Sequence, residues 1–259
     1  MKPTRKAKLK AAAADQTPRI TVNSPYQVLV FGAHPDDIEF GCGGIVARET
    51  QAGRKVHFIL CSRGEAGTNG TPAGRTIEAE NAARLLGATI EFVELDGDAH
   101  LEIKAAHAIK LAGIIRRTKP TILLAPTLEQ NQHPDHWRLG QLVRDAARLA
   151  RYGGVGELKA QTSHAIGQLF FYAITSNAEP ATIQPVLIDV SAPKVTAAWI
   201  AAMEAHASQL TTRNYVELQL ARARVNGSRC GVSAALALFP NDSLVFDSLA
   251  LLTHGARRF

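Results

Sequence analysis

The chain has 259 residues, of which 46% are hydrophobic and 20% charged, a balance that is ordinary for a soluble globular protein and excludes a wholly disordered chain. No apolar run approaches the roughly 18 residues that cross a bilayer, so the sequence predicts no transmembrane segment and no membrane partner. Its three cysteines show no Cys-x-x-Cys spacing, which predicts neither a disulfide scaffold nor a thiolate metal site and favours a reducing, cytoplasmic location.

The net charge of +6 comes mostly from the N-terminal segment. Residues 1–19 carry a net charge of +5, whereas the rest of the chain holds 23 basic and 22 acidic side chains. We therefore interpret residues 1–22 as a basic disordered tail and residues 23–259 as a single folded domain. A basic tail can bind nucleic acid, but a solvated arm is the simpler interpretation, and we expect no nucleic-acid partner.

Segments typical of strands and helices alternate along the chain. Short apolar runs between turn residues predict strands at 26–32, 56–61, 89–95 and 121–125. Longer segments that end near glycine or basic residues predict helices at 45–53, 75–86, 103–117 and 137–152. Two further strands are predicted at 168–174 and 186–190, and two helices within 193–224.

This alternation predicts parallel strands joined by right-handed crossovers. The fold class is therefore α/β, a Rossmann-like, doubly wound and mainly parallel sheet with helices on both faces. Ligands of such sheets bind beyond the carboxyl ends of the strands, where the strand order reverses. In the common strand orders the first and fourth strands are neighbours at that point, so the loops that follow them should face each other.

Both of these loops contain a His-Pro-acid run, HPDD from residue 34 and HPDH from residue 133. Each proline favours an extended residue before it and a helix start at its own position. His34 and Asp37 would then lie on one face of a first helical turn, as would His133 and His136. One such run alone is typical of a turn. Two such runs, each following one of two adjacent strands, would place histidines and aspartates together in one cleft. Because unpaired charge is costly in a protein interior, this arrangement indicates a functional site.

Two imidazoles and one carboxylate are ligands that a catalytic zinc ion takes when it keeps a position open for water. We predict His34, Asp37 and His136 as metal ligands of Zn²⁺, a set that would also accept another divalent ion such as Fe²⁺. Asp36 is turned about 100° around the helix from Asp37. It would act as the general base that takes a proton from the metal-bound water.

His133 and Asp135 are predicted to support the same chemistry. A protonated His133 would stabilise an oxyanion, and Asp135 would hold its ring in one tautomer. The nearby run GCGG at 41–44 offers an alternative, a phosphate-binding loop. It does not match G-x-G-x-x-G, and the carboxylates before it would repel a pyrophosphate. We interpret these glycines as allowing a helix start to pack closely.

The run FGAHPDDIEFGCGG from residue 31, together with the later HPDH, resembles the PIG-L/LmbE family of zinc-dependent N-acetylglucosaminyl deacetylases. Within it, the chain is similar to the bacterial thiol-pathway members of the bacillithiol and mycothiol type. The resemblance extends from about Val28 to at least Gln209 and includes RGEAGTNG at 63–70. It implies an LmbE-like fold, the metal ligands and base named above, and an electrostatic or acid role for His133.

The resemblance also implies two substrate-binding residues. Arg75 matches a family arginine at the sugar site, although a surface charge on a helix is the alternative. Tyr172 lies where relatives line the cleft, although a core position is equally compatible with its apolar run. Many relatives end with a Gly-Val-x-Tyr-Ala-Glu-like segment, whereas residues 231–236 here read GVSAAL. The sequence therefore does not define the part of the site that binds the aglycone, nor a subunit contact formed by this segment.

The sequence thus predicts a hydrolase of a C–N bond outside peptides, which removes the N-acetyl group from an N-acetylglucosamine conjugate by attack of zinc-bound hydroxide, with Asp36 as the base. Its partner would be a small amino-sugar substrate, and a homotrimer or homohexamer would be in keeping with the family. Two alternatives are a metal-dependent amidase or esterase acting on a non-sugar acyl substrate, and a non-catalytic carbohydrate-binding relative.

Overall fold

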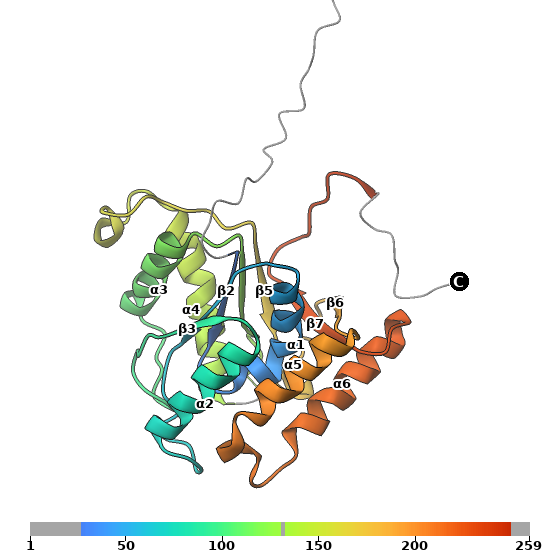
Figure 1. Ribbon diagram of the computed structural model, residues 1–259. Helices are drawn as coiled ribbons and strands as arrows, with labels where there is room; N and C mark the ends of the chain where they lie inside the picture. Colours follow the sequence, from blue (N-terminus) through green and yellow to red (C-terminus); the bar gives the residue numbers. More distant parts are fainter. Residues whose placement is uncertain (1–26, 131–132, 250–259) are drawn as a thin grey trace, which may run out of the picture.

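A seven-stranded sheet forms the centre of the molecule in the computed structural model, which describes residues 27–130 and 133–249 (Figure 1). The predicted tail at 1–22 lies outside the described residues. The strands occur in the order β3-β2-β1-β4-β5-β7-β6. They are β1 (Val28–Gly32), β2 (Val56–Leu60), β3 (Thr89–Phe92), β4 (Ile122–Pro126), β5 (Gln168–Tyr172), β6 (Val186–Asp189) and β7 (Ala235–Pro240).

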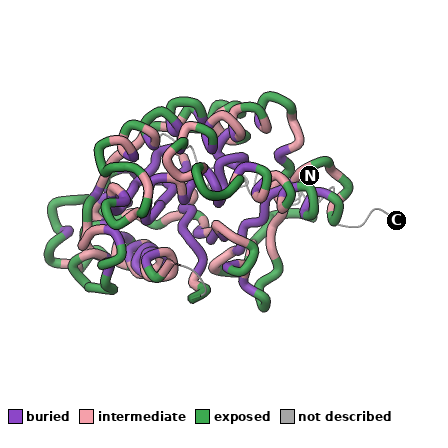
Figure 2. Tube along the Cα trace, turned by 90° about the horizontal axis from the view of Figure 1, so that it is seen from below, coloured by how far each residue is buried: buried purple, intermediate pink, exposed green. Residues whose placement is uncertain are grey.

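Helices cover both faces of this sheet (Figure 1). One face packs against α1 (Asp37–Gln51), α2 (Pro72–Leu85), α5 (Pro193–Glu204) and α6 (Tyr215–Cys230), and the other against α3 (Ala105–Thr118) and α4 (Pro134–Arg151). Because both faces are covered, the central strands are apolar throughout, and Figure 2 shows buried chain in the middle of the molecule with exposed segments around it. Among the described helices, none is long and apolar enough to cross a membrane.

The pairing confirms the predicted doubly wound α/β fold. Strands β1 to β5 pair in parallel with one another, and β1 pairs with both β2 and β4. The strand order therefore reverses between β1 and β4, where Val28 lies opposite Ile122. The carboxyl ends of these two strands carry the two His-Pro loops, which the fold brings together across the switch point.

Two elements differ from the sequence prediction. Helix α1 begins at Asp37, whereas the sequence predicted a start at residue 45. The predicted start was too late because the glycines of α1 have low helix propensity. Strand β7 was not predicted; it pairs antiparallel with both β5 and β6. Part of the GVSAAL segment therefore lies within a strand of the sheet.

Gly41 allows α1 to pack directly on the Tyr172 side chain of β5. A Cβ atom at this position would overlap the ring, which is fully buried and donates a hydrogen bond from its hydroxyl to the Phe31 carbonyl oxygen (2.7 Å). Gly41→Ala is therefore expected to lower the free energy of unfolding by about 1–3 kcal/mol, although alanine favours a helix by roughly 1 kcal/mol. Urea denaturation followed by circular dichroism measures this change.

The matched control is Gly153→Ala, because an added Cβ at Gly153 meets nothing within 4 Å. This variant is expected to stay within about 0.5 kcal/mol of the parent. Equal stability of the two variants would show that the contact between α1 and the Tyr172 ring tolerates a methyl group, contrary to this packing.

Candidate active site

The loop after β1 positions two adjacent carboxylates. Asp36 has a φ of 104°, a left-handed conformation that is uncommon outside glycine but more frequent for Asp and Asn. Such backbone strain is often found at functional sites. The next residue, Asp37, begins α1 and folds its side chain back, so that its Oδ2 accepts hydrogen bonds from the backbone N–H groups of Ala33 (2.9 Å) and His34 (3.0 Å). Its Oδ1 is directed to the second loop.

The second loop ends at the start of α4. Pro134 is the first residue of that helix and His133 is its N-cap, as the fixed φ of proline predicts. The backbone N–H of Asp135 donates to His133 Nδ1 (3.4 Å). His136, in the first turn of the helix, places its Nε2 at 3.0 Å from Asp37 Oδ1.

The structure brings the three predicted metal ligands together. One nitrogen of His34, one oxygen of Asp37 and one nitrogen of His136 lie within 4.8 Å of one another. His34 Nδ1 is 3.5 Å from Asp37 Oδ2. Two imidazole nitrogens and a carboxylate oxygen at this spacing suit a divalent transition metal that keeps a position open for water. The donor set therefore fits the predicted ion.

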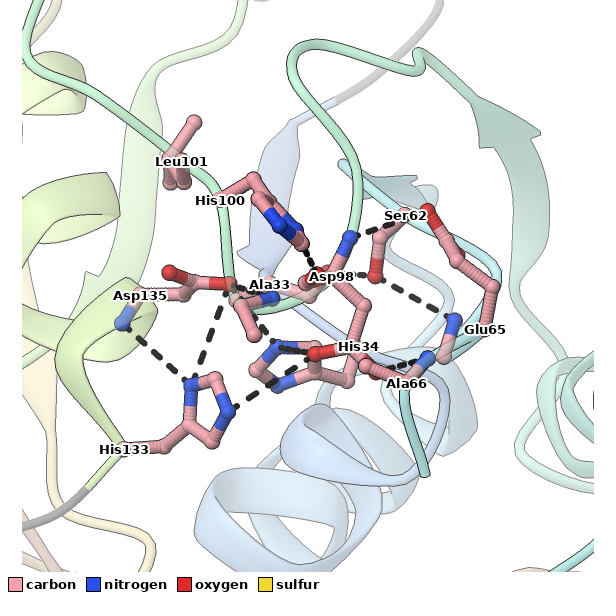
Figure 3. Close-up of polar contacts among 12 residues, drawn as sticks. Ala33, His34, Ser62, Glu65, Ala66, Asp98, His100, Leu101, His133 and Asp135 are labelled. Atoms are coloured by element: carbon pink, nitrogen blue, oxygen red, sulfur yellow. Dashed lines mark hydrogen bonds and ion pairs between the residues drawn. The ribbon is translucent and has the colours of Figure 1, made fainter. Parts of the chain in front are cut away.

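The other nitrogen of His34 faces two carboxylates. His34 Nε2 lies 3.0 Å from Asp98 Oδ1 and 3.3 Å from Asp135 Oδ2, and Figure 3 shows both acids and His133 around the His34 ring. A carboxylate behind a metal-binding histidine fixes its tautomer and its orientation. Sequence reasoning missed Asp98. The available signal was its position shortly after the third strand, whose carboxyl end lies at the same edge of the sheet.

The charges of this cluster shift its pKa values in opposite directions. Burial alone would lower the pKa of His34, but the Asp37, Asp135 and Asp98 carboxylates outweigh it and raise that pKa well above its usual value. Burial would raise the pKa of Asp37, but His136 and His34 hold it well below its usual value. The carboxylates around the His34 imidazole stabilise positive charge at this position. A divalent cation is therefore suited to the site.

Arg75 holds Asp36 and the loop after β2. Its side chain is almost fully buried, so it is not a surface charge. Its guanidinium donates to the carbonyl oxygens of Gly64 (2.9 Å) and Pro35 (2.8 Å), and Nη2 lies 3.5 Å from Asp36 Oδ2. Gly64 has a φ of 69°, and a Cβ there would overlap the guanidinium. Burial, with a contribution from the Asp37 charge, raises the pKa of Asp36 to about 7, while His206 and Arg75 oppose the rise.

Asp135 and His133 are arranged differently from the expectation that Asp135 orients the His133 ring. Asp135 Oδ2 lies 3.8 Å from His133 Nδ1 but 3.3 Å from His34 Nε2, and it accepts the Ala99 N–H at 2.7 Å. Burial and the positive charge of His34 lower the pKa of His133. With Nδ1 facing the Asp135 N–H at 3.4 Å, Nε2 is the ring nitrogen that is free to donate a hydrogen bond. The protonated His133 ring stays a prediction from the sequence.

These groups line one pocket of about 350 Å³, a size found for small-molecule sites. Six of the eight predicted site residues border it, namely His34, Asp36, Asp37, Arg75, His133 and His136. Asp135 lies just behind them, in contact with His34. The structure does not bring Tyr172 to the pocket: its ring is in the core and its hydroxyl is bonded to Phe31. A larger hollow of about 490 Å³, beside β3 and α3, contains none of these site residues.

The fold and the site define an α/β protein with a two-histidine, one-carboxylate cluster at the switch point of a mainly parallel sheet. Residues 29–147 match the PIG-L family, described as GlcNAc-PI de-N-acetylase. The chain belongs to the PIG-L family. The matched segment includes both His-Pro loops and ends within α4.

Three curated relatives share about half of this chain. The uncharacterized deacetylase YaiS of Escherichia coli K12 is 34% identical over 49% of this chain and 71% of its own. The diacetylchitobiose deacetylase of Thermococcus kodakarensis is 31% identical, over 50% of this chain and 53% of its own. The 4-oxalmesaconate hydratase of Pseudomonas putida is 30% identical, over 51% of this chain and 56% of its own. The matches to the last two therefore span little more than half of those proteins.

The likeness to solved structures is more extensive. The conserved protein TT1542 from Thermus thermophilus is 30% identical to this chain, with a TM-score of 0.75. The superposition covers 85% of this chain and 97% of TT1542. The family fold therefore continues well beyond residue 147, through the strands and helices of the C-terminal half.

Proposed function

We propose that this protein is a metal-dependent deacetylase that hydrolyses the N-acetyl group of an N-acetylglucosamine conjugate. The observation that carries the proposal is the donor cluster of His34, Asp37 and His136, which lines the same pocket as the half-buried carboxylate of Asp36. Membership of the PIG-L family and the likeness to the deacetylases of Escherichia coli and Thermococcus kodakarensis support it.

The three ligands would hold a divalent ion, Zn²⁺ by the chemistry of the set or Fe²⁺ in its place. Such an ion supplies Lewis acidity toward water and the acetyl oxygen. Asp36 takes a proton from the attacking water as the oxygen of that water bonds to the acetyl carbon. The proton then passes to the amine nitrogen as the C–N bond breaks, which leaves acetate and a free amine.

Other residues assist this reaction without exchanging protons. His133 donates its Nε2–H to the carbonyl oxygen as negative charge develops there. Asp98 and Asp135 orient the His34 ring through its Nε2. Arg75 positions Asp36 and lines the pocket, where it is placed to contact the sugar. A cytoplasmic location and a trimeric or hexameric assembly stay predictions from the sequence.

A second candidate reaction follows from the hydratase among the relatives. Adding water to a carbon–carbon double bond also needs a positioned water and a base, so the same cluster is compatible with it. A non-sugar amide or ester is a third possible substrate for the same groups. The reaction must therefore be tested directly.

The test is release of primary amine from free N-acetylglucosamine, diacetylchitobiose and the malate and inositol glycosides of N-acetylglucosamine. Each is assayed with added zinc and with a chelator, and hydration of an unsaturated dicarboxylic acid is followed in parallel by loss of absorbance. We expect chelator-sensitive amine release and no hydration. Hydration alone, or silence from every sugar with zinc demonstrably bound, would contradict the proposal.

A further inference from the structure

An exposed carboxylate lies behind one of the acids that face His34. Glu65 is in the loop between β2 and α2, is exposed to solvent, and is not among the described residues that border the pocket. It is therefore not placed to contact a substrate or a metal ion. Substitution of an exposed residue usually has little effect on a protein, but the hydrogen bonds of Glu65 distinguish it from most exposed acids.

Both carboxylate oxygens of Glu65 accept hydrogen bonds from the backbone. Oε1 accepts from the N–H of Asp98 (2.9 Å), in the loop after β3, and Oε2 accepts from the N–H of Arg63 (2.9 Å) in its own loop. Partial burial would raise the pKa of Glu65, but the backbone hydrogen bonds outweigh it and lower that pKa. The group is therefore a charged acceptor, and hydrogen bonds to a charged acceptor are stronger than those between neutral groups.

The contact between the two loops is reciprocal. The Asp98 side chain accepts a hydrogen bond through Oδ2 from the N–H of Ala66 (3.1 Å), the neighbour of Glu65. Each loop thus donates one backbone N–H to a carboxylate of the other. We call this pair of hydrogen bonds the Glu65–Asp98 clasp, and Figure 3 shows Glu65, Ala66 and His34 around Asp98.

The turn at 97–99 is shaped to allow this close approach. Gly97 has a φ of 93°, which favours glycine, and a Cβ atom there would lie 2.7 Å from Glu65 Oε1. A side chain at this position would therefore move the Glu65 carboxylate away from the Asp98 N–H. Ala99 also has a positive φ, of 66°, and its N–H bonds to Asp135 Oδ2 (2.7 Å).

The clasp leaves the second oxygen of Asp98 available to the site. Asp98 Oδ1 lies 3.0 Å from His34 Nε2 and 3.7 Å from His133 Nε2. A carboxylate behind a metal-binding histidine fixes the orientation of the ring, and in this protein that carboxylate is itself held by the clasp. Contacts therefore run without a break from the exposed Glu65 through Asp98 to His34.

We propose that Glu65 is a positioning residue of the metal centre, which holds Asp98 so that Asp98 orients His34 as a ligand. Glu65 does this from the protein surface, without touching the ion or the substrate. This inference rests on the proposed function, because it needs His34 to bind the metal ion of that reaction.

The experiment measures the Kd for Zn²⁺ of the full-length chain by competition with a chelating dye. Glu65→Ala removes both acceptors and should raise this Kd by about tenfold, the lower end of the range for groups behind a metal ligand. Glu65→Gln keeps one acceptor oxygen and should recover part of the loss. With saturating zinc, the KM for diacetylchitobiose should stay within about threefold of the parent, because uniform substrate binding is not affected.

A double-mutant cycle tests whether Glu65 acts through Asp98. In the Asp98→Ala background, Glu65→Ala should weaken zinc binding by no more than about threefold further, the part that the contact between Ala99 and Asp135 carries. Glu80→Ala removes an exposed acid of α2 outside the pocket. It is the matched control and should leave the Kd for Zn²⁺ unchanged.

A spectroscopic measurement separates ligand orientation from a general loss of structure. The visible absorption of the Co²⁺-loaded protein reports the geometry of the donor set. We expect Glu65→Ala to alter this spectrum while the circular dichroism of the backbone stays that of the parent, and Glu65→Gln to return the spectrum toward the parent. A parent-like Co²⁺ spectrum for Glu65→Ala would contradict the positioning role.

The other outcomes separate this inference from the proposed function. Unchanged zinc affinity of Glu65→Ala, a rise in KM alone, or a full tenfold further loss in the Asp98→Ala background would overturn the inference and leave the donor set intact. If the parent binds zinc but no sugar releases amine, the proposed function fails, while a weaker zinc affinity of Glu65→Ala still supports the role of Glu65. If the parent binds no zinc, both fail.

Discussion

Asp36→Asn is expected to fold and to bind its metal as the parent does, yet to hydrolyse the amide about 10²–10⁴-fold more slowly. Asparagine has nearly the shape of aspartate but cannot take a proton from water. It also tolerates the left-handed backbone found at this position, where φ is 104°, so the substitution leaves the loop geometry intact. Amine release from diacetylchitobiose gives the rate, and elemental analysis gives the metal content.

The control for this variant is Asp145→Asn on α4, outside the pocket, where the carboxylate accepts a hydrogen bond from Gln141 (2.9 Å). It loses a negative charge in the same way, and we expect its rate to stay within about twofold of the parent, as for most surface substitutions. Normal turnover by the Asp36→Asn variant would exclude Asp36 as the base.

His136→Ala is expected to lose the metal itself. Removing this side chain leaves two donors of the set and takes away the imidazole that lies 3.0 Å from Asp37 Oδ1. Loss of a group that only orients a ligand typically lowers metal affinity 10–100-fold, so loss of a ligand should lower it by more than about 100-fold. After dialysis the variant should hold far less than one ion per chain, and amide hydrolysis should fall to background.

The control here is His164→Ala, a histidine that bonds to the Pro120 carbonyl oxygen (2.7 Å) away from the pocket. It should keep a full complement of metal. A fully loaded and active His136→Ala variant would remove His136 from the donor set. It would favour instead the second group of close donor atoms, His34, Asp98, His133 and Asp135.

The sequence predicted the features that depend on local patterns. Apolar runs bounded by turn residues identified six of the seven strands, and the common strand orders of doubly wound sheets placed the first strand beside the fourth, as β1 and β4 are. This adjacency, with a proline in each loop, predicted that His34, Asp37 and His136 lie close together. The start of α1 was not predicted because helix propensity depends on the local sequence alone. The glycines of α1 pack closely against Tyr172 and Trp199, which lie far away in the sequence.

Features that depend on contacts through space were not predicted. Asp98 belongs to the site because it lies 3.0 Å from His34 Nε2, and nothing in its sequence context specifies that distance. Asp135 lies nearer to the His34 ring than to the His133 ring, which the spacing within HPDH does not specify. Tyr172 was predicted to bind substrate, but its hydroxyl donates a hydrogen bond to the Phe31 carbonyl oxygen. Strand β7 pairs antiparallel with β5, some 65 residues earlier in the chain, which no local periodicity reveals.

The proposed metal donors and base occupy a different stretch of the chain from another part of the pocket lining. Residues 29–147 contain the two His-Pro loops, whereas Ile174, Thr175, Gln209, Tyr215 and Gln219 line the pocket from later in the chain. With the proposed function, chemistry and recognition are then largely separable along the polypeptide. Mutations after residue 160 can accumulate, or be exchanged in chimeras, without replacing an atom that reacts. Such modularity gives a physical route by which relatives that share one half of the chain diverge in what they act upon.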